Sequence, residues 1–218
     1  MLASAVFHTG YYFYLLKAYE HGELVQVYPL ARGTAPLLIT AGGYLFAGES
    51  LGYLALCGIL LASVGIISLS LEGRGRRGAS NQAVMAALIT SCWIAAYSVT
   101  DGLGGRSAGN ILSYICWLAF IDGWPILLYT LYRRGVAMPC YFIQHWRYCA
   151  CGGMFSITAY GLVIFAMSLG AMGMVSALRE TSVIMAALIG VWFLKEKISP
   201  IRISSVILVT VGVLLMYQ

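Results

Sequence analysis

Charged residues are scarce in this chain of 218 residues. Asp, Glu, Lys and Arg together make up 10% of it, against about a quarter of an ordinary soluble domain. Hydrophobic residues make up 61%. This composition excludes a typical soluble protein and predicts an integral membrane protein that lies in a lipid bilayer. Ten-residue segments of alternating polarity are absent, so helices are the expected spanning structure.

Motifs for catalysis and for metal binding are also missing. The chain has no H-E-x-x-H, no G-x-S-x-G and no paired ligand spacing, so the sequence predicts no enzyme, cofactor or metal site. Cys149 and Cys151 form a C-x-C pair without a second pair, and we interpret them as small apolar packing residues. The net charge of +5 comes from basic residues in short loops, so no nucleic-acid partner is expected.

Long apolar stretches predict an all-α, polytopic membrane bundle of about eight transmembrane helices. The connecting segment 101–110, rich in glycine, is expected to be a mobile loop, and the longest loop is expected at 133–148. The expected spans are 2–18, 26–47, 51–71, 82–100, 111–132, 149–169, 172–194 and 201–217.

The second and seventh spans carry one pattern twice. A shift of 147 positions superposes three pairs of polar residues: Arg32 on Arg179, Thr34 on Thr181, and Glu49 on Glu196. Polar matches in one ungapped register indicate an internal repeat. The seventh span comes five places after the second, an odd number, so the copies should run in opposite directions, each with its arginine about 10 Å from its own membrane face. Inverted repeats of this kind are typical of secondary transporters.

Several short motifs resemble those of the EamA-type members of the drug/metabolite transporter superfamily. They are Ala18–Tyr19, Pro29, Pro36, Gly48–Glu49, Val64–Gly65–Ile66, Leu194–Lys195–Glu196 and Val211–Gly212–Val213. The resemblance implies ten helices in two five-helix halves that carry small metabolites. This chain would then hold three helices of the first repeat at 1–71, a basic connecting loop at 72–81, and all five helices of the second repeat at 82–218. Either a leading part is absent, or the chain is an eight-span variant.

Charges inside the expected spans are the first candidates for a functional site, because they are costly in hydrocarbon. We expect Arg32 and Arg179 to bind an anionic group such as a carboxylate or phosphate, which the planar guanidinium can hold with two hydrogen bonds. Alternatively, Arg179 pairs with Asp122 or Glu180, while Arg32 bonds helix carbonyls or reaches the surface. Asp122 and Glu180 are accordingly either proton-coupling acids or structural ion-pair partners.

Glutamates and aromatic residues complete the set of candidates. Glu49 and Glu196 end their spans and are expected to be structural, or to gate by bonding neighbouring helix ends. An aromatic cage for an organic substrate is a second hypothesis, and ordinary packing is its alternative. The aromatic candidates are Tyr28, Trp93, Tyr97 and Trp117, with Tyr114 beside them.

The sequence as a whole predicts a secondary transporter, or permease, of small metabolites such as organic anions or amino-acid-like compounds. Alternating access is the expected mechanism, the bacterial inner membrane the expected location, and a homodimer an open possibility. A non-transporting membrane subunit or a lipid-handling helical protein is the alternative.

Overall fold

The computed structural model describes residues 1–71, 80–135, 137–182, 185 and 199–218, and within these ranges its regular elements are helices. The prediction of an all-α fold is confirmed. The helices are α1 (Leu2–His21), α2 (Leu24–Ala47), α3 (Tyr53–Leu69), α4 (Asn81–Ser107), α5 (Ile111–Arg134), α6 (Ala137–Gln144), α7 (Trp146–Leu169), α8 (Met172–Arg179) and α10 (Pro200–Met216).

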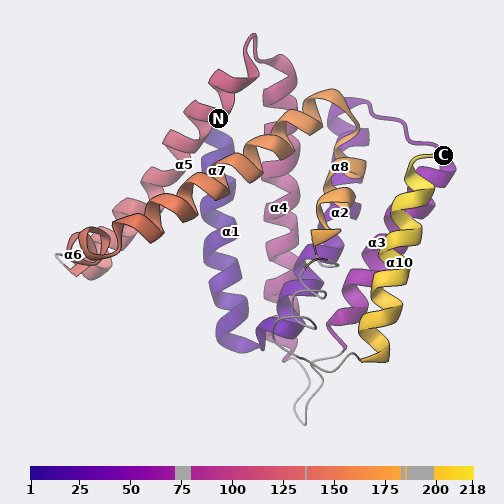
Figure 1. Cartoon of the computed structure of the whole chain (residues 1–218), viewed down its shortest axis with the longest axis horizontal. Helices are drawn as coiled ribbons and strands as arrows, with labels where there is room; N and C mark the ends of the chain where they lie inside the picture. The colour runs from indigo at the N-terminus through magenta and orange to yellow at the C-terminus, as the bar shows by residue number, and fades with distance from the viewer. Residues whose placement is uncertain (72–79, 136, 183–184, 186–198) are drawn as a thin grey trace.

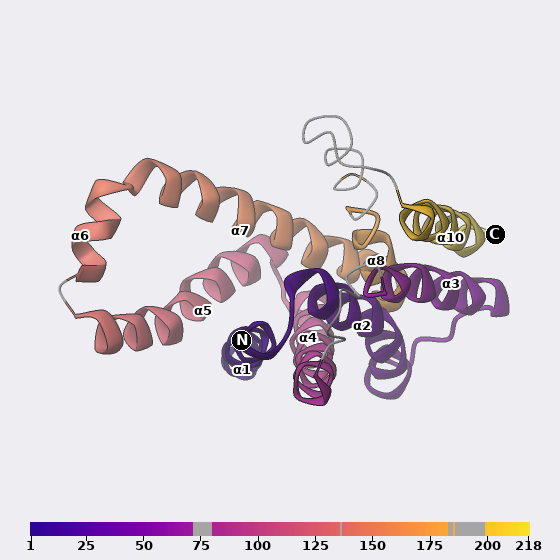
Figure 2. The ribbon, with the colours of Figure 1, turned by 90° about the horizontal axis from the view of Figure 1, so that it is seen from below.

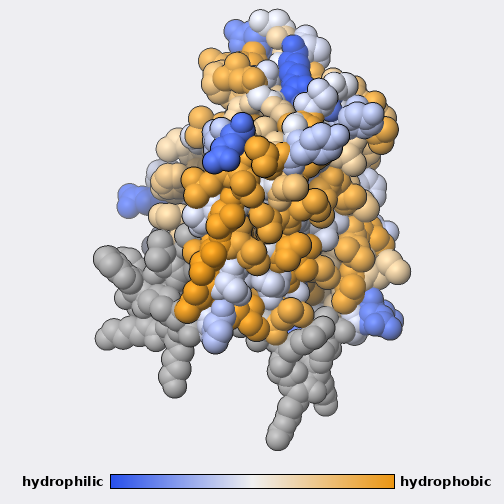
Figure 3. Space-filling view, turned by 90° about the vertical axis from the view of Figure 1, so that its right-hand side faces the viewer, coloured by the Kyte–Doolittle hydropathy of each residue, from blue (hydrophilic) through white to orange (hydrophobic). Residues whose placement is uncertain are grey.

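The helices have the length and surface of a membrane protein. In the described ranges, α4, α5 and α7 are long and apolar enough to cross a bilayer, and α3 and α10 are apolar helices of 17 residues. Figure 3 shows hydrophobic side chains over much of the face nearest α3 and α10. The chain is therefore an integral, multi-pass membrane protein. The total of eight spans and the division at 72–81 stay predictions.

Most of the helices form one group, and two lean away from it. The helices α1, α4, α2, α3 and α10 follow one another across the molecule, with α8 beside α2 (Figure 1). By contrast, α5 and α7 extend to one side and are joined at their far ends by α6, as Figure 2 shows from below. This arm meets the main group where α5 contacts α1 and where α7 contacts α4.

The helices α3 and α10 are related as two copies of one element. Both bounds of α10 lie 147 positions after those of α3, which is the register of the repeat. Gly58 lies against the backbone of Gly212, and Gly65 lies against Ser205. The early part of α3 thus meets the late part of α10, and the helices are antiparallel. A shift of 147 positions takes Gly58 to Ser205 and Gly65 to Gly212. The shift therefore converts each contact into the other, as a two-fold axis would.

The helices α2 and α8, which carry the two arginines, are antiparallel as well. Gly173, near the start of α8, lies against Thr40 in the last third of α2. Glu180, just beyond the end of α8, instead bonds Arg32, nearer the start of α2. The opposite directions predicted for the repeated spans are therefore present in the structure.

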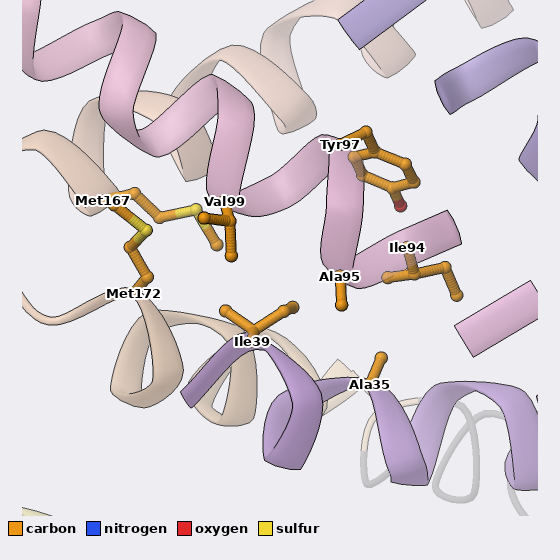
Figure 4. Packing of buried hydrophobic residues seen from close by; sticks show 8 residues of the cluster. All are labelled: Ala35, Ile39, Ile94, Ala95, Tyr97, Val99, Met167 and Met172. Atoms are coloured by element: carbon orange, nitrogen blue, oxygen red, sulfur yellow. The ribbon is translucent and has the colours of Figure 1, made fainter. Parts of the chain in front are cut away.

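A hydrophobic cluster joins α2, α4, α7 and α8 beside the arginines. Ile39 on α2 packs between Val99 on α4 and Met172 on α8 (Figure 4). Ile39 and Met172 have no exposed surface, so this layer is closely packed. The cluster consists of Ala35, Ile39, Ile94, Ala95, Tyr97, Val99, Met167 and Met172.

Two predicted loops are wrong, because helix occupies most of each. Helix α4 continues to Ser107 and so includes the glycine-rich stretch expected to be a loop from residue 101. Three glycines there meet other helices: Gly102 lies against Met172, Gly104 against Tyr114, and Gly105 against Ile164. The absence of side chains allows these close approaches, and packing outweighs the weak helix propensity of glycine. The expected loop 133–148 likewise contains α6 and the first turn of α7.

The seventh expected span is interrupted at its charged residues. Helix α8 ends at Arg179, and Glu180 follows as its C-cap. Most of the remaining stretch expected to reach residue 194 lies outside the described residues, as does Glu196. The break places Arg179 and Glu180 at a helix end inside the bundle. Discontinuous helices commonly form the binding sites of transporters, since they free polar groups at membrane depth.

Candidate functional site

Glu180 is bonded to both arginines of the repeat. Its carboxylate oxygen Oε2 accepts a hydrogen bond of 3.0 Å from Nε of Arg32, and Oε1 accepts one of 3.3 Å from Nε of Arg179. Glu180 has no exposed surface, and both guanidinium groups are mostly buried. Of the two partners considered for Arg179, the structure brings Glu180 to it. The three formal charges sum to one positive charge.

Arg179 keeps capacity for another partner, and Arg32 is held in place inside the bundle. The Nη2 atom of Arg179 is buried and has no hydrogen-bond partner among the described residues. The guanidinium of Arg32 lies over the ring of Tyr28, with 5.5 Å between the central carbon and the ring centroid. This cation–π contact and the bond to Glu180 hold Arg32 in the bundle rather than at its surface. Pro36 has no N–H, so the carbonyl of Arg32 lacks the usual helical donor.

The two arginines line a cavity of about 490 Å³, which is within the usual range of small-molecule sites. Its walls come from α1, α2, α4, α5 and α7, with Arg179 from the end of α8. The lining combines charged, aromatic and aliphatic side chains. Its polar and aromatic members are His8, Tyr11, Tyr12, Arg32, Tyr97, Asp122, Ser156, Tyr160 and Arg179.

Asp122 lies in the same cavity lining but has no arginine beside it. The nearest cationic candidate is His8, whose Nδ1 is 3.8 Å from Oδ1 of Asp122. His8 also places Nδ1 at 3.0 Å from the carbonyl of Ser4. A carbonyl can only accept, so Nδ1 carries a proton and donates it to Ser4. The structure therefore separates the two carboxylates predicted as coupling or ion-pair groups: Glu180 is paired with both arginines, whereas Asp122 faces His8.

The aromatic candidates do not form one cage. Tyr97 lines the cavity and stacks on His8, with 4.0 Å between ring centroids. Tyr28 lies under Arg32, outside the cavity lining. Trp93 packs on Gly10, where α4 meets α1, and Trp117 is 56% exposed on the outer face of α5. Only Tyr97 of these four lines the cavity, and the tyrosines of α1 and α7 join it there.

Asp101 is a polar centre that the sequence reasoning missed. It has no exposed surface and accepts a hydrogen bond of 3.1 Å from the hydroxyl of Tyr114 and one of 2.7 Å from that of Tyr160. Asn110 caps α5 through its side chain, which starts that helix close enough for Tyr114 to reach back to α4. Asp101 thus joins α4, α5 and α7 and fixes Tyr160, which lines the cavity. An aspartate within an otherwise apolar pattern was the available signal.

Glu49 connects the helix ends at one side of the bundle. Gly48 ends α2 in the left-handed region, with φ of 65°, and turns the chain at Glu49. The carboxylate of Glu49 accepts hydrogen bonds of 3.0 and 3.1 Å from the backbone N–H of Met172, at the start of α8, and pairs with Arg106. Arg106 also donates to the carbonyls of Met167 and Gly170. Ends of α2, α4, α7 and α8 are therefore tied together here.

Residues that could hold a metal do not gather in the described part of the chain. No group of three or more His, Cys, Asp or Glu side chains has a suitable arrangement there. The chemistry available in the cavity is thus that of guanidinium, carboxylate, imidazole and phenol groups. These can bind, orient and protonate a ligand.

Comparison with known proteins identifies the family. No curated protein matches the sequence. The model of the EamA-like transporter family matches residues 81–218, which begin at the first residue of α4 and continue to the last residue of the chain. The match covers more than half of the chain and includes Asp101, Asp122, Arg179 and Glu180. The chain belongs to the EamA-like transporter family, a family of membrane transporters.

Proposed function

We propose that the protein is a secondary transporter of small metabolites that carry an anionic group, in the bacterial inner membrane. The observation that carries this proposal is the position of Arg179. Its guanidinium lines the cavity and is held by Glu180 through Nε, and its buried Nη2 has no hydrogen-bond partner among the residues that the structure describes. A carboxylate or phosphate oxygen would supply the missing acceptor. Arg32 lines the same cavity and adds a second positive charge.

Glu180 lowers the electrostatic cost of placing two arginines at one cavity. Two buried guanidinium groups without a counter-charge would repel each other and would lack the solvation of water. Glu180 neutralises one of the two charges and orients both groups through their Nε atoms. The one remaining positive charge attracts an anion but still allows its release.

Alternating access fits the two antiparallel helix pairs. The repeat relates α2 to α8 and α3 to α10. If the two helices of each pair exchange their roles, the same fold can adopt two related conformations that open the cavity to opposite sides. The bonds of Glu49 to Arg106 and Met172 close one side, because they tie four helix ends together. We propose that these bonds form and break in each transport cycle.

Uptake into proteoliposomes tests the anion site. The purified chain is reconstituted, and uptake of radiolabelled succinate, benzoate and phosphate is measured. We expect uptake of at least one of them above empty liposomes. Arg179→Gln should reduce that uptake at least tenfold, whereas Arg179→Lys, which keeps the charge but not the planar fork, should lose less.

Arg133→Gln is the matched control, because it removes an arginine from the exposed end of α5. Its uptake should equal that of the native chain. Equal uptake by native chain and Arg179→Gln would contradict the anion site. If none of the three compounds enters and none binds in a thermal-shift assay, a non-transporting or lipid-handling role would replace the present proposal.

A further inference from the structure

The far end of the arm, where α6 joins α5 to α7, is a surface separate from the cavity (Figure 2). Helix α5 ends at Arg134 and α7 begins at Trp146. Both helices are long and apolar enough to cross a bilayer, so these two ends lie at the same face of the membrane. Helix α6 contacts both of them. We call residues 134, 135 and 137–148 the arm tip.

The arm tip exposes aromatic side chains of the kind that gather at a membrane surface. Tyr141 and Phe142 on α6 are exposed, and so are Trp146 and Tyr148 at the start of α7. The ring of His145 lies next to those of Tyr141 and Tyr148, with 4.6 and 6.5 Å between centroids, so one row of rings joins α6 to α7. Tyrosine and tryptophan favour the level of the lipid headgroups. The arm tip is therefore suited to lie in the headgroup layer.

Two arginines flank α6 at equal distances along the chain. Arg134 lies three positions before the first residue of α6, and Arg147 lies three positions after its last residue. Both are exposed, and neither forms an ion pair with a described residue. The sequence has no Asp or Glu from residue 123 to residue 179. The arm tip therefore carries a positive charge that no neighbouring acid in the chain neutralises.

Arg147 is positioned by the residue before it. Its guanidinium lies over the ring of Trp146, with 5.6 Å between the central carbon and the ring centroid. This cation–π contact uses the face of the guanidinium, whereas the N–H groups lie along its edge. A phosphate group can accept two hydrogen bonds from that edge at once. The contact with an interfacial tryptophan thus holds the guanidinium at the depth where lipid phosphates lie.

We propose that the arm tip binds the phosphate headgroup of an anionic phospholipid, with Arg147 and Arg134 as the cationic contacts and α6 in the headgroup layer. Charge complementarity selects this occupant. The surface is basic and aromatic, and basic groups beside membrane spans attract anionic lipids. The site shares no residue with the cavity lining and does not depend on the proposed function. Because α5 and α7 also form walls of the cavity, the lipid would hold the joined ends of two cavity helices.

Native mass spectrometry of the full chain tests the site. The purified chain in detergent is titrated with phosphatidylglycerol and with phosphatidylcholine of the same acyl chains. The dissociation constants of the first bound lipid are then compared. We expect phosphatidylglycerol to bind at least tenfold more tightly, because only its headgroup has a net negative charge that the two arginines can neutralise.

Variants assign this preference to the arm tip. Arg147→Gln should lower it about fivefold, which is roughly the contribution of one arginine near an anionic membrane surface. Arg147→Lys keeps the charge without the planar fork and should lose less. The double variant Arg134→Gln/Arg147→Gln should bind the two lipids equally within twofold. Phosphatidylcholine binding that stays within twofold of the native value shows that each variant is folded.

Arg133→Gln is the matched control, because it removes the same charge from the end of α5 at a position one residue further from α6. Its preference should stay within twofold of that of the native chain. Equal losses in Arg133→Gln and Arg147→Gln would overturn the site, since the attraction would then follow net charge alone. Equal binding of the two lipids by the native chain would also overturn it, because the arm tip would then not distinguish headgroups.

Discussion

Arg32 and Arg179 bond opposite oxygens of the same buried carboxylate, although they lie 147 positions apart in the chain. Only the second copy of the repeat supplies the acid, because the residue after Arg32 is Gly33, whereas Glu180 follows Arg179. One negative charge therefore serves two equivalent positive ones. This asymmetry leaves the three residues with a net positive charge. It also means that substitution of Glu180 should affect the site more than substitution of either arginine.

Replacement of Glu180 should destabilise the protein more than replacement of either arginine. Glu180→Gln leaves two buried guanidinium groups without a counter-charge, and loss of one partner from a buried ion pair costs about 3–5 kcal/mol. Arg32→Met leaves Glu180 paired with Arg179, so we expect a smaller loss. Unfolding in mixed micelles measures both, with Arg133→Gln as the surface control. A Glu180→Gln variant as stable as the native chain would refute this account of the three charges.

Asp101 should behave as a structural connector that also positions a cavity residue. Asp101→Ala leaves two tyrosine hydroxyls unpaired, at about 1–3 kcal/mol each. In a double-mutant cycle with Tyr114→Phe, the losses should be less than additive, because the second change removes a group that has already lost its partner. Unfolding free energies of the two single variants and the double variant measure the coupling. Strict additivity would show that the hydrogen bond contributes nothing.

The Glu49 contacts should control opening at one side of the bundle. Glu49→Ala removes the acceptor of the Met172 N–H and the partner of Arg106, so we expect amide hydrogen exchange at the start of α8 to rise roughly tenfold. Mass spectrometry of the peptide that contains Met172 measures it. Glu23→Ala, an exposed glutamate just before α2, is the control and should leave this peptide unchanged. Identical exchange in both variants would exclude a gating role for Glu49.

The internal repeat was predictable from sequence, and so was the direction of its copies. Arg32, Arg179 and Glu180 are charged residues in apolar stretches of the sequence. Because a charge inside a membrane is energetically costly, such residues can be identified as candidates from the sequence. The sequence could not decide which acid pairs with which arginine. Asp122 and Glu180 were equally acceptable partners for Arg179, and the choice depends on where α8 ends. Contacts of this kind depend on helix rotation and on helix breaks, which local patterns do not determine.

Asp101 was missed for a different physical reason. In a soluble protein the stretch from Asp101 to Asn110, with its four glycines, would predict a loop. Here three of these glycines let α5, α7 and α8 approach α4 closely, and the helix continues through them to Ser107. Within a membrane bundle, glycine is enriched where helices contact each other, so its presence does not by itself indicate a turn. The buried position of Asp101 follows from that contact and could not be read from propensity.

The paired glycine contacts between α3 and α10 lead to a graded prediction. A side chain at Gly212 would place its Cβ 2.5 Å from the carbonyl oxygen of Gly58 and 2.8 Å from the backbone nitrogen of Ala62. Backbone atoms cannot rotate away as a side chain can, so Gly212→Ala must push the two helices apart. Overpacking of this kind costs about 1–3 kcal/mol. Gly65→Ala meets Leu208 and Ser205 at 3.0 Å and should cost less.

Gly152→Ala is the control for this series, because no atom lies within 4 Å of the added Cβ and alanine favours a helix by about 0.5–1 kcal/mol. Thermal unfolding in detergent should therefore rank the variants with Gly152→Ala as the most stable, then Gly65→Ala, then Gly212→Ala. Equal stability of Gly212→Ala and Gly152→Ala would mean that α3 and α10 do not touch at Gly58 in the membrane. Without that contact, the two-fold relation between the repeats would lose its packing basis.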